Sequence, residues 1–341
     1  MITDHVPLPT HPPTQSVRSA RLPARSAAVS PGVATAPGEA DFTQLGRLGR
    51  TSWRRHLAAV ATIVGFWVVL GGVVTVLAMR AAAGDDPAGW TGGSLGGYLV
   101  VNASLLCLLV GVAVAVRYVH HRPVRSLITS RRRVDVRRVL QGFAVFTALL
   151  GATRAVQAQW HPDQFALTTD LLADPGRWLV WAPVVLLLTP LQAAAEELFF
   201  RGYALQSLGL LTRRTWVLVA ISAVLFAAPH ALNPELLANP LPTAGTYLLA
   251  GTLLAVVTLR DNRLELAIGV HAANNVFVVL VVNHPYSALP SPAIWSTPLD
   301  PGYDLVTQVL AAVMFCLLLV RRPATTRPRA VPVAATGSAG R

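Results

Sequence analysis

The residues best suited to chemistry in this sequence are two acids and two histidines in apolar surroundings. Glu196 and Glu197 are the only acids deep within an apolar stretch, and His230 and His271 are the only histidines well inside one or at its buried end. Inside a membrane, an ionisable side chain is costly unless it is paired or lines a cavity. A carboxylate removed from water becomes a better base. These four side chains are therefore the candidate site of a reaction.

The spacing around the two glutamates gives them different partners. Glu197 and Arg201 are i and i+4, so they share one face of a helix and can form an ion pair. Glu196 is rotated by about 100° from Glu197 around the helix axis. We therefore expect a structural pair between Glu197 and Arg201, and a Glu196 carboxylate that faces a cavity.

The two histidines also have neighbours at helical spacing. Asn275 follows His271 at i+4, which places an amide beside an imidazole, and Phe226 precedes His230 by the same interval. Asn274, at i+3 from His271, stays an alternative to Asn275 because it lies near the same face.

The turn at Arg213 and Arg214 allows the depths of two candidates to be compared. Glu196 lies about 27 Å before Arg214 along a continuous helix, and His230 lies about 24 Å after it. Two antiparallel helices joined at this turn would place the two side chains at nearly the same depth. We therefore expect Glu196 and His230 to converge.

These residues belong to a chain with the composition of a membrane protein. Of its 341 residues, 53% are hydrophobic and only 13% are charged, whereas about a quarter of the residues of a soluble domain are charged. A helix needs about 20 residues to cross a bilayer. Apolar runs near that length predict eight helices, at 57–79, 98–117, 139–157, 178–210, 215–232, 243–260, 263–282 and 303–320. The expected fold is an all-α, polytopic membrane helix bundle of about eight transmembrane helices, the fourth of them broken by Pro183 and Pro190.

The arginines indicate how the helices are oriented. The formal net charge is +12, and every basic residue is an arginine. Arginines gather at alternate ends of the apolar runs, as the positive-inside rule requires, so both termini are expected to be cytoplasmic and the protein to reside in the cell membrane. Arg154, within the third run, is an exception whose side chain can snorkel. No basic face is formed, which argues against nucleic acid as a partner.

The expected domain organisation is one membrane domain between two tails. Residues 1–52 and 323–341 are rich in Pro, Ala, Ser and Arg and have no apolar periodicity. Such segments bury too little surface to fold, so both are expected to be disordered. The transmembrane domain is placed at 53–322.

Three motifs carry a resemblance to a known family. They read Glu196-Glu197-Leu-Phe-Phe-Arg201, Phe226-Ala-Ala-Pro-His230 and His271-Ala-Ala-Asn-Asn275. In order and spacing they resemble the CPBP family of intramembrane proteases, which includes type II CAAX endopeptidases, bacteriocin-processing enzymes and Abi-like proteins. The resemblance covers a core at 178–282, about a third of the chain.

The resemblance implies a hydrolase that cleaves a peptide bond through water activated by a glutamate, without a cofactor. Its partners would be the lipid bilayer and a membrane-associated or prenylated-like peptide or protein. Arginine without lysine suggests a GC-rich bacterial genome, so the family name does not identify the substrate. Glu196 would activate the water with help from His230, while His271 and Asn275 would stabilise the oxyanion. Structural support would come from Glu197, Arg201 and Phe226.

Two alternatives remain beside this interpretation. Glu196, His230 and His271 could supply three zinc ligands with a fourth position open for water. A noncatalytic membrane protein, such as an immunity partner, a channel or a transporter, could also use buried charges. A further pattern, G-x-S-x-G ending at Gly96, resembles a nucleophile elbow but follows an acidic loop instead of a strand.

Overall fold

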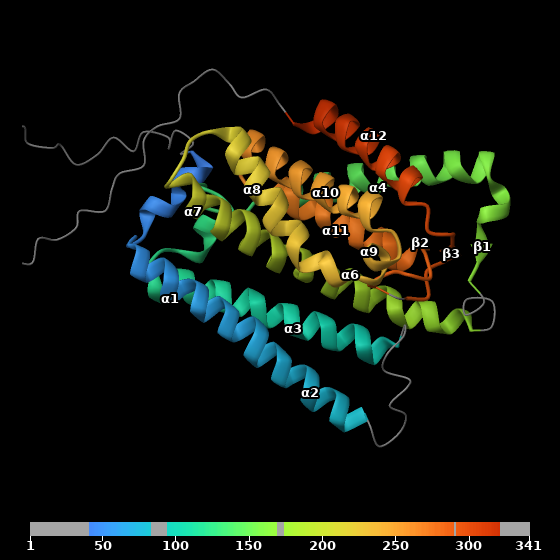
Figure 1. Cartoon of the computed structure of the whole chain (residues 1–341), viewed down its shortest axis with the longest axis horizontal. Helices are drawn as coiled ribbons and strands as arrows, with labels where there is room; N and C mark the ends of the chain where they lie inside the picture. Colours follow the sequence, from blue (N-terminus) through green and yellow to red (C-terminus); the bar gives the residue numbers. More distant parts are fainter. Residues whose placement is uncertain (1–40, 83–93, 169–173, 290, 321–341) are drawn as a thin grey trace, which may run out of the picture. The chain divides into compact units, whose positions relative to one another are not determined.

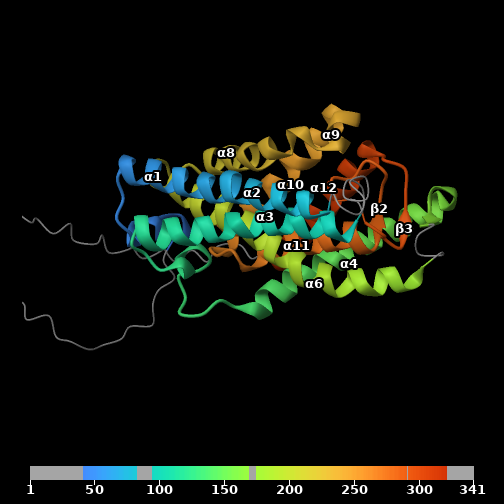
Figure 2. The same cartoon turned by 90° about the horizontal axis from the view of Figure 1, so that it is seen from below.

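The computed structural model describes residues 41–82, 94–168, 174–289 and 291–320. Seven helical segments among them are long and apolar enough to cross a membrane. Figures 1 and 2 show these helices running side by side. The chain is therefore a polytopic helical bundle, and a multi-pass membrane protein.

The seven long segments follow the predicted runs closely. The first combines α1 (Trp53–Val64), the π-helix η2 (Gly65–Leu70) and α2 (Gly71–Ala82), and the second combines α3 (Leu95–Val114) with η4 (Ala115–Val119). The others are α4 (Val136–Trp160), α6 (Pro175–Glu197) continued by η7 (Leu198–Leu205) and α7 (Gln206–Gly209), α8 (Thr215–Ala227) with η8 (Ala228–Leu232), α10 (Pro240–Asp261) and α12 (Pro301–Leu319).

The helix starts have local causes in the sequence. A side-chain oxygen at each start accepts a hydrogen bond from a free backbone N–H of the first turn, which stabilises a helix N-terminus. The capping residues are Ser52, Ser94, Asp135, Asp174 and Asp300. Ser94, the serine of the G-x-S-x-G pattern, thus caps α3 by accepting from the N–H of Gly97 at 3.1 Å.

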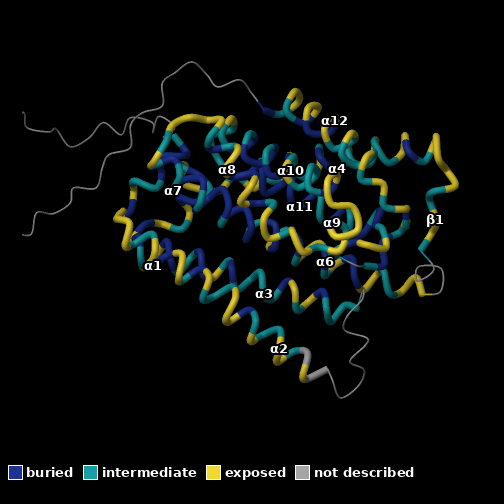
Figure 3. The backbone as a smooth tube through the Cα atoms, in the orientation of Figure 1, coloured by how far each residue is buried: buried dark blue, intermediate teal, exposed yellow. Residues whose placement is uncertain are grey.

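The helix predicted at 263–282 is α11 (Glu265–Leu280), which has only 16 residues. At about 24 Å it is shorter than the hydrocarbon layer. It packs against α4, α6 and α10 and is almost entirely buried (Figure 3). Because protein surrounds α11, it does not need the length of a lipid-facing helix.

Close backbone packing fixes α11 against α4. A Cβ on Gly269 would lie 2.1 Å from the carbonyl oxygen of Val139, and a Cβ on Gly142 would lie 2.6 Å from that of Leu266. Small residues allow membrane helices to approach in this way. The two glycines therefore set the position of α11, which carries His271.

The prediction that Pro183 and Pro190 break the fourth helix is wrong. Helix α6 continues through both prolines. In a membrane helix, neighbouring elements can satisfy the backbone groups that a proline frees. The geometry instead changes at Leu198, where the π-helix η7 begins directly after the two glutamates. Short π segments often occur at functional sites.

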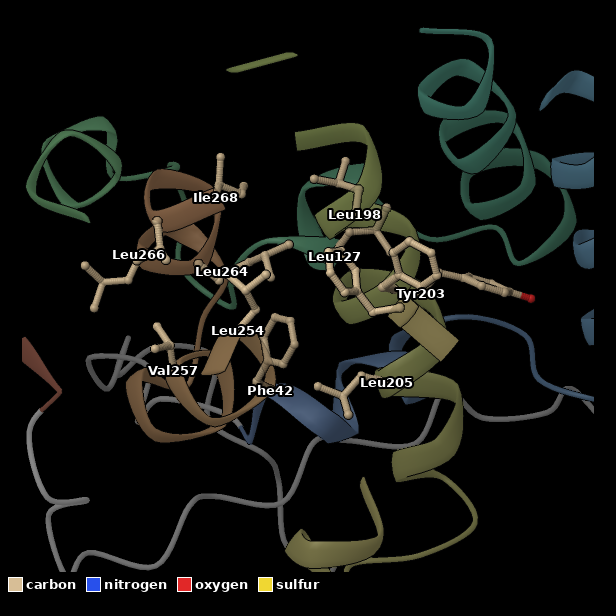
Figure 4. Packing of buried hydrophobic residues seen from close by; sticks show 14 of the residues in the cluster. Phe42, Leu127, Leu198, Tyr203, Leu205, Leu254, Val257, Leu264, Leu266 and Ile268 are labelled. Atoms are coloured by element: carbon tan, nitrogen blue, oxygen red, sulfur yellow. The ribbon is translucent and has the colours of Figure 1, made fainter. Parts of the chain in front are cut away.

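Ordered structure begins before residue 53, which corrects the predicted disordered tail of 1–52. A 3₁₀ helix, η1 (Phe42–Leu48), is ordered, and Phe42 and Leu45 are buried. Phe42 belongs to the same apolar cluster as Leu205 and Leu254 (Figure 4). The Phe42 N–H also donates to Asn262 Oδ1 at 2.7 Å. Residues 1–40 and 321–341, which include the rest of the two predicted tails, lie outside the described residues.

Short elements complete the described part of the chain. These are η5 (Val124–Leu127), η6 (Pro162–Gln164) and α9 (Pro234–Ala238), with strands β1 (Ala166–Leu167), β2 (Val282–Asn283) and β3 (Trp295–Ser296). The sheet order is β1-β3-β2; β3 is antiparallel to β1 and parallel to β2. This sheet lies at the end of α11 (Figure 1).

Candidate active site

The four predicted catalytic side chains line one cavity. Glu196 on α6, His230 on η8, and His271 and Asn275 on α11 all contribute to a cavity of about 430 Å³. Glu196 is 8% exposed and His271 is 6% exposed. The expected convergence of Glu196 and His230 across the turn at Arg213 and Arg214 is therefore observed.

A completely buried ion pair, called the sealed pair below, is formed by Glu197 and Arg201 beside this cavity. Arg201 Nη1 is 2.8 Å from Glu197 Oε1, and neither side chain is exposed. Arg201 Nη2 donates to the carbonyl oxygen of Gly251 at 3.1 Å. A Cβ on Gly251 would lie 2.8 Å from the Cα of Ala223, so this glycine allows α10 to approach α8 and present that carbonyl. The predicted pairing of Glu197 with Arg201 is confirmed.

Phe226 packs against the guanidinium and against both histidines. Arg201 Cζ lies 4.5 Å from the centroid of the Phe226 ring. The same ring is 5.0 Å from the His230 ring and 5.6 Å from the His271 ring, measured between centroids. A cation over an aromatic face is attracted to it. Phe226 therefore contacts three residues of the predicted site.

His271 connects the sealed pair to the cavity. Its Nδ1 is 2.9 Å from Glu197 Oε1. An ionised carboxylate can only accept, so Nδ1 carries the proton. The other ring nitrogen, Nε2, is 3.9 Å from Glu196 Oε2. One imidazole thus contacts both glutamates, one through each nitrogen.

Glu196 accepts a hydrogen bond from a residue of its own helix. Gln192 Nε2 donates to Glu196 Oε1 at 3.4 Å, and both residues line the cavity. Glu197, rotated by about 100°, is not among the lining residues. The two adjacent glutamates therefore face different surroundings, as their spacing predicted.

His230 is oriented by two contacts. Its Nδ1 is 2.8 Å from the carbonyl oxygen of Phe226. Because a carbonyl oxygen only accepts, Nδ1 carries the proton and Nε2 is unprotonated in the neutral ring. The ring is stacked on Tyr247, with centroids 4.4 Å apart and planes at 29°.

Both asparagines of the third motif line the cavity. Asn274 Nδ2 donates to Asn275 Oδ1 at 3.2 Å. This contact leaves the amide nitrogen of Asn275 available as a donor. The geometry thus keeps Asn275 as a candidate oxyanion donor and keeps Asn274 beside it.

Several cavity residues were not anticipated from the sequence. Gln192 could have been found, because it precedes Glu196 by one helical turn. Tyr247, Asn233 and Glu235 carry no such signal. These last three form one hydrogen-bonded group next to His230.

A second ion pair lies elsewhere along the cavity wall. Arg154 does not simply snorkel, because its Nη2 is 2.6 Å from Asp304 Oδ1, with side-chain exposures of 25% and 23%. His284 lines the same cavity. Burial lowers the pKa of His284 below the usual histidine value, although Glu235 and Asp304 act in the opposite direction.

The zinc alternative requires three ligands that meet at one point. In the part of the chain that the structure describes, no three His, Cys, Asp or Glu side chains are placed to hold a metal ion, and this includes Glu196, His230 and His271. A catalytic zinc site needs three such ligands directed at one point.

Comparison with known proteins confirms the resemblance carried by the three motifs. Residues 176–277 match the family described as type II CAAX prenyl endopeptidase Rce1-like. The uncharacterized protein YyaK of Bacillus subtilis (strain 168) is 34% identical over 189 residues, which are 54% of this chain and 62% of that protein. This chain thus spans less than two thirds of that relative's length. No solved structure matches.

Proposed function

We propose that this chain is an intramembrane endopeptidase in which Glu196 activates a water molecule. The observation that carries the proposal is the meeting of Glu196, His230, His271 and Asn275 in one cavity of a membrane helix bundle. The match of residues 176–277 to a family of endopeptidases supports the same reaction. The substrate would be a membrane-associated or prenylated-like peptide or protein.

The attacking step uses two groups that can accept a proton. Glu196 takes a proton from water as the oxygen adds to the peptide carbonyl carbon, which gives a tetrahedral intermediate. His230 faces the cavity with an unprotonated Nε2 and can help to orient the water or carry the proton. The proton then passes to the leaving nitrogen as the carbon–nitrogen bond breaks.

The developing oxyanion needs donors in the same cavity. The Nδ2 group of Asn275 is one donor, and Nε2 of His271 becomes a second when that ring carries two protons. A doubly protonated His271 also makes the group of Glu196, Glu197, Arg201 and His271 neutral in total charge. Buried charges are tolerated when they are compensated in this way. Preorganised donors are most effective where water is scarce.

Glu196→Gln tests the function directly. The variant keeps size and most hydrogen bonding but removes the base, so cleavage should be abolished while the protein stays folded. Purified full-length protein in lipid vesicles would be given libraries of internally quenched peptides, unmodified or anchored by a farnesyl or acyl chain. Mass spectrometry would identify the bond cleaved.

The matched control for this test is Glu265→Gln. Glu265 is a fully buried acid on α11 outside the cavity lining, and it accepts from the backbone N–H of Asp135 at 3.2 Å. This variant should retain cleavage. If Glu196→Gln cleaves as fast as the unaltered chain, Glu196 is not the base, and a noncatalytic partner role replaces the peptidase.

A chelator experiment tests the proposed absence of a metal. We propose that cleavage survives EDTA and phenanthroline, because a carboxylate can activate water without zinc. Cleavage that is lost on chelation and restored by zinc would instead make Glu196, His230 and His271 ligands. The measurement is the initial rate before chelation, after chelation and after zinc is added.

We also propose that the protein resides in the cell membrane with both termini in the cytoplasm. The arginine-rich links support this orientation. Topology reporters fused at 163–168, at 235–240 and at 285–289 should report the face opposite to reporters at 125–135. A reporter at 163–168 on the same face as 125–135 would contradict the orientation.

A further inference from the structure

We propose that Tyr247 is a positioning residue for His230 and is itself fixed by Glu235 and Asn233. This inference rests on the proposed function, because it assigns these residues to the proton-accepting side of the same cavity. All four residues line that cavity.

The contacts form one chain from α9 and α10 to the His230 ring. The Tyr247 hydroxyl donates to Glu235 Oε1, and Asn233 Nδ2 donates to the Tyr247 hydroxyl at 2.7 Å. Asn233 Nδ2 also lies 3.4 Å from Glu235 Oε1. The Tyr247 ring then lies 4.4 Å from the His230 ring, nearly parallel to it. Each contact limits the freedom of the next side chain.

His230 needs such support because the short helix that carries it restrains the side chain poorly. It lies in η8, a five-residue 3₁₀ helix, and 3₁₀ hydrogen bonds have poorer geometry than those of an α-helix. On either side of it, Pro229 and Ala231 are exposed. The hydrogen bond from Nδ1 to Phe226 fixes one point of the ring. The stack on Tyr247 fixes the plane of the ring, and thereby the direction of Nε2.

The same arrangement suits a histidine that becomes charged during the reaction. An imidazolium stacked on a tyrosine face is attracted by its π-electrons. The carboxylate of Glu235, bound to the hydroxyl of that tyrosine, adds a negative charge behind the ring. Other ionisable groups around the cavity that His230 shares are Glu196, His271, His284, Arg154 and Asp304.

Substitutions of Tyr247 separate positioning from general stability. Tyr247→Leu removes the stack and should lower kcat by about 10²-fold, since a displacement near 1 Å can have that effect. KM should change by less than about threefold, because substrate binding does not depend on the direction of Nε2. Tyr247→Phe keeps the stack but loses the hydroxyl bonds to Glu235 and Asn233, so it should recover only part of the lost kcat.

Tyr303→Phe is the matched control. The Tyr303 hydroxyl donates to the carbonyl oxygen of Thr153 at 2.8 Å, and Tyr303 is outside the cavity lining. This variant also loses a tyrosine hydroxyl bond but should leave kcat unchanged. Full kcat in Tyr247→Leu, or a loss matched by the loss of folded protein, would overturn the proposal.

A second readout does not depend on turnover. In ¹⁵N-histidine NMR of the full chain, the His230 signals are identified by their loss in His230→Gln. They should show one Nδ1-protonated ring in the unaltered chain, broadened or averaged signals in Tyr247→Leu, and intermediate broadening in Tyr247→Phe, which keeps the stack but loses the hydroxyl bonds. A sharp, unchanged ring in Tyr247→Leu overturns the proposal even if peptides are cleaved. If no peptide is cleaved while the ring behaves as described, it is the peptidase function that fails.

Discussion

The two adjacent glutamates at the end of helix α6, Glu196 and Glu197, lie in contrasting surroundings. On the sealed side, Glu197 and Arg201 are completely buried and paired at 2.8 Å. On the cavity side, Glu196 is also largely buried, but it has only a 3.4 Å hydrogen bond from Gln192 and lies 3.9 Å from His271 Nε2. One side holds its charges in a close ion pair, and the other leaves the Glu196 carboxyl group facing the cavity with longer contacts.

If Glu196 is the base proposed above, this difference shows how a membrane protein can keep a reactive acid. A buried charge is stable only when compensated, yet a fully compensated carboxylate is a poor base. Under that proposal the two tasks belong to consecutive residues, and His271 contacts both of them. Substitutions on the sealed side should therefore affect folding first, and substitutions on the cavity side should affect turnover first.

The largest effect is expected from breaking the sealed pair. Arg201→Ala or Glu197→Gln strands the partner's charge and should lower stability by about 3–5 kcal/mol. The measurements are the yield of monodisperse protein in detergent and its thermal unfolding midpoint. Glu196→Gln, one residue away and chemically identical to Glu197→Gln, is the control and should keep a normal yield.

A double variant sharpens this test. Glu197→Gln combined with Arg201→Met removes both charges, so it should be less destabilised than Arg201→Ala alone. If Glu196→Gln unfolds the protein while Glu197→Gln does not, the assignment of the sealed and reactive sides is reversed.

Local rules in the sequence were sufficient for much of this arrangement. Helical spacing predicted the pair of Glu197 with Arg201 and the different direction of Glu196. Rise per residue predicted that Glu196 and His230 reach one cavity. These predictions succeed because each depends on one helix or on one turn between two helices.

Long-range packing explains what the sequence did not reveal. The order of η1 depends on bonds from Phe42 to Asn262 and from Gln44 to Gly209, which span 220 and 165 residues. The stack of Tyr247 on His230 depends on the rotation of α10 relative to η8, which hydropathy does not encode. Likewise, the continuity of α6 through Pro183 depends on its neighbours in the bundle.

The next largest effect concerns turnover on the cavity side. His271→Ala and Asn275→Ala should each lower kcat by about 10²–10³-fold if both stabilise an oxyanion. The measurement is kcat on a cleaved library peptide, normalised to folded protein because His271 also contacts Glu197. Asn274→Ala discriminates between the two amides: a greater loss there than in Asn275→Ala would transfer the donor role to Asn274.

The smallest effect should come from the other ion pair at the cavity, between Arg154 and Asp304. Its 2.6 Å distance is even shorter than that of the sealed pair, but both side chains are about a quarter exposed. Water therefore competes for both charges, and exposed pairs typically contribute about 0.2–1 kcal/mol. A double-mutant cycle with Arg154→Met and Asp304→Asn would measure the coupling, which should fall further at high salt. A salt-independent coupling free energy of about 3 kcal/mol or more would contradict this expectation. It would show that the partly exposed pair of Arg154 with Asp304 is shielded from water as well as the buried pair of Glu197 with Arg201.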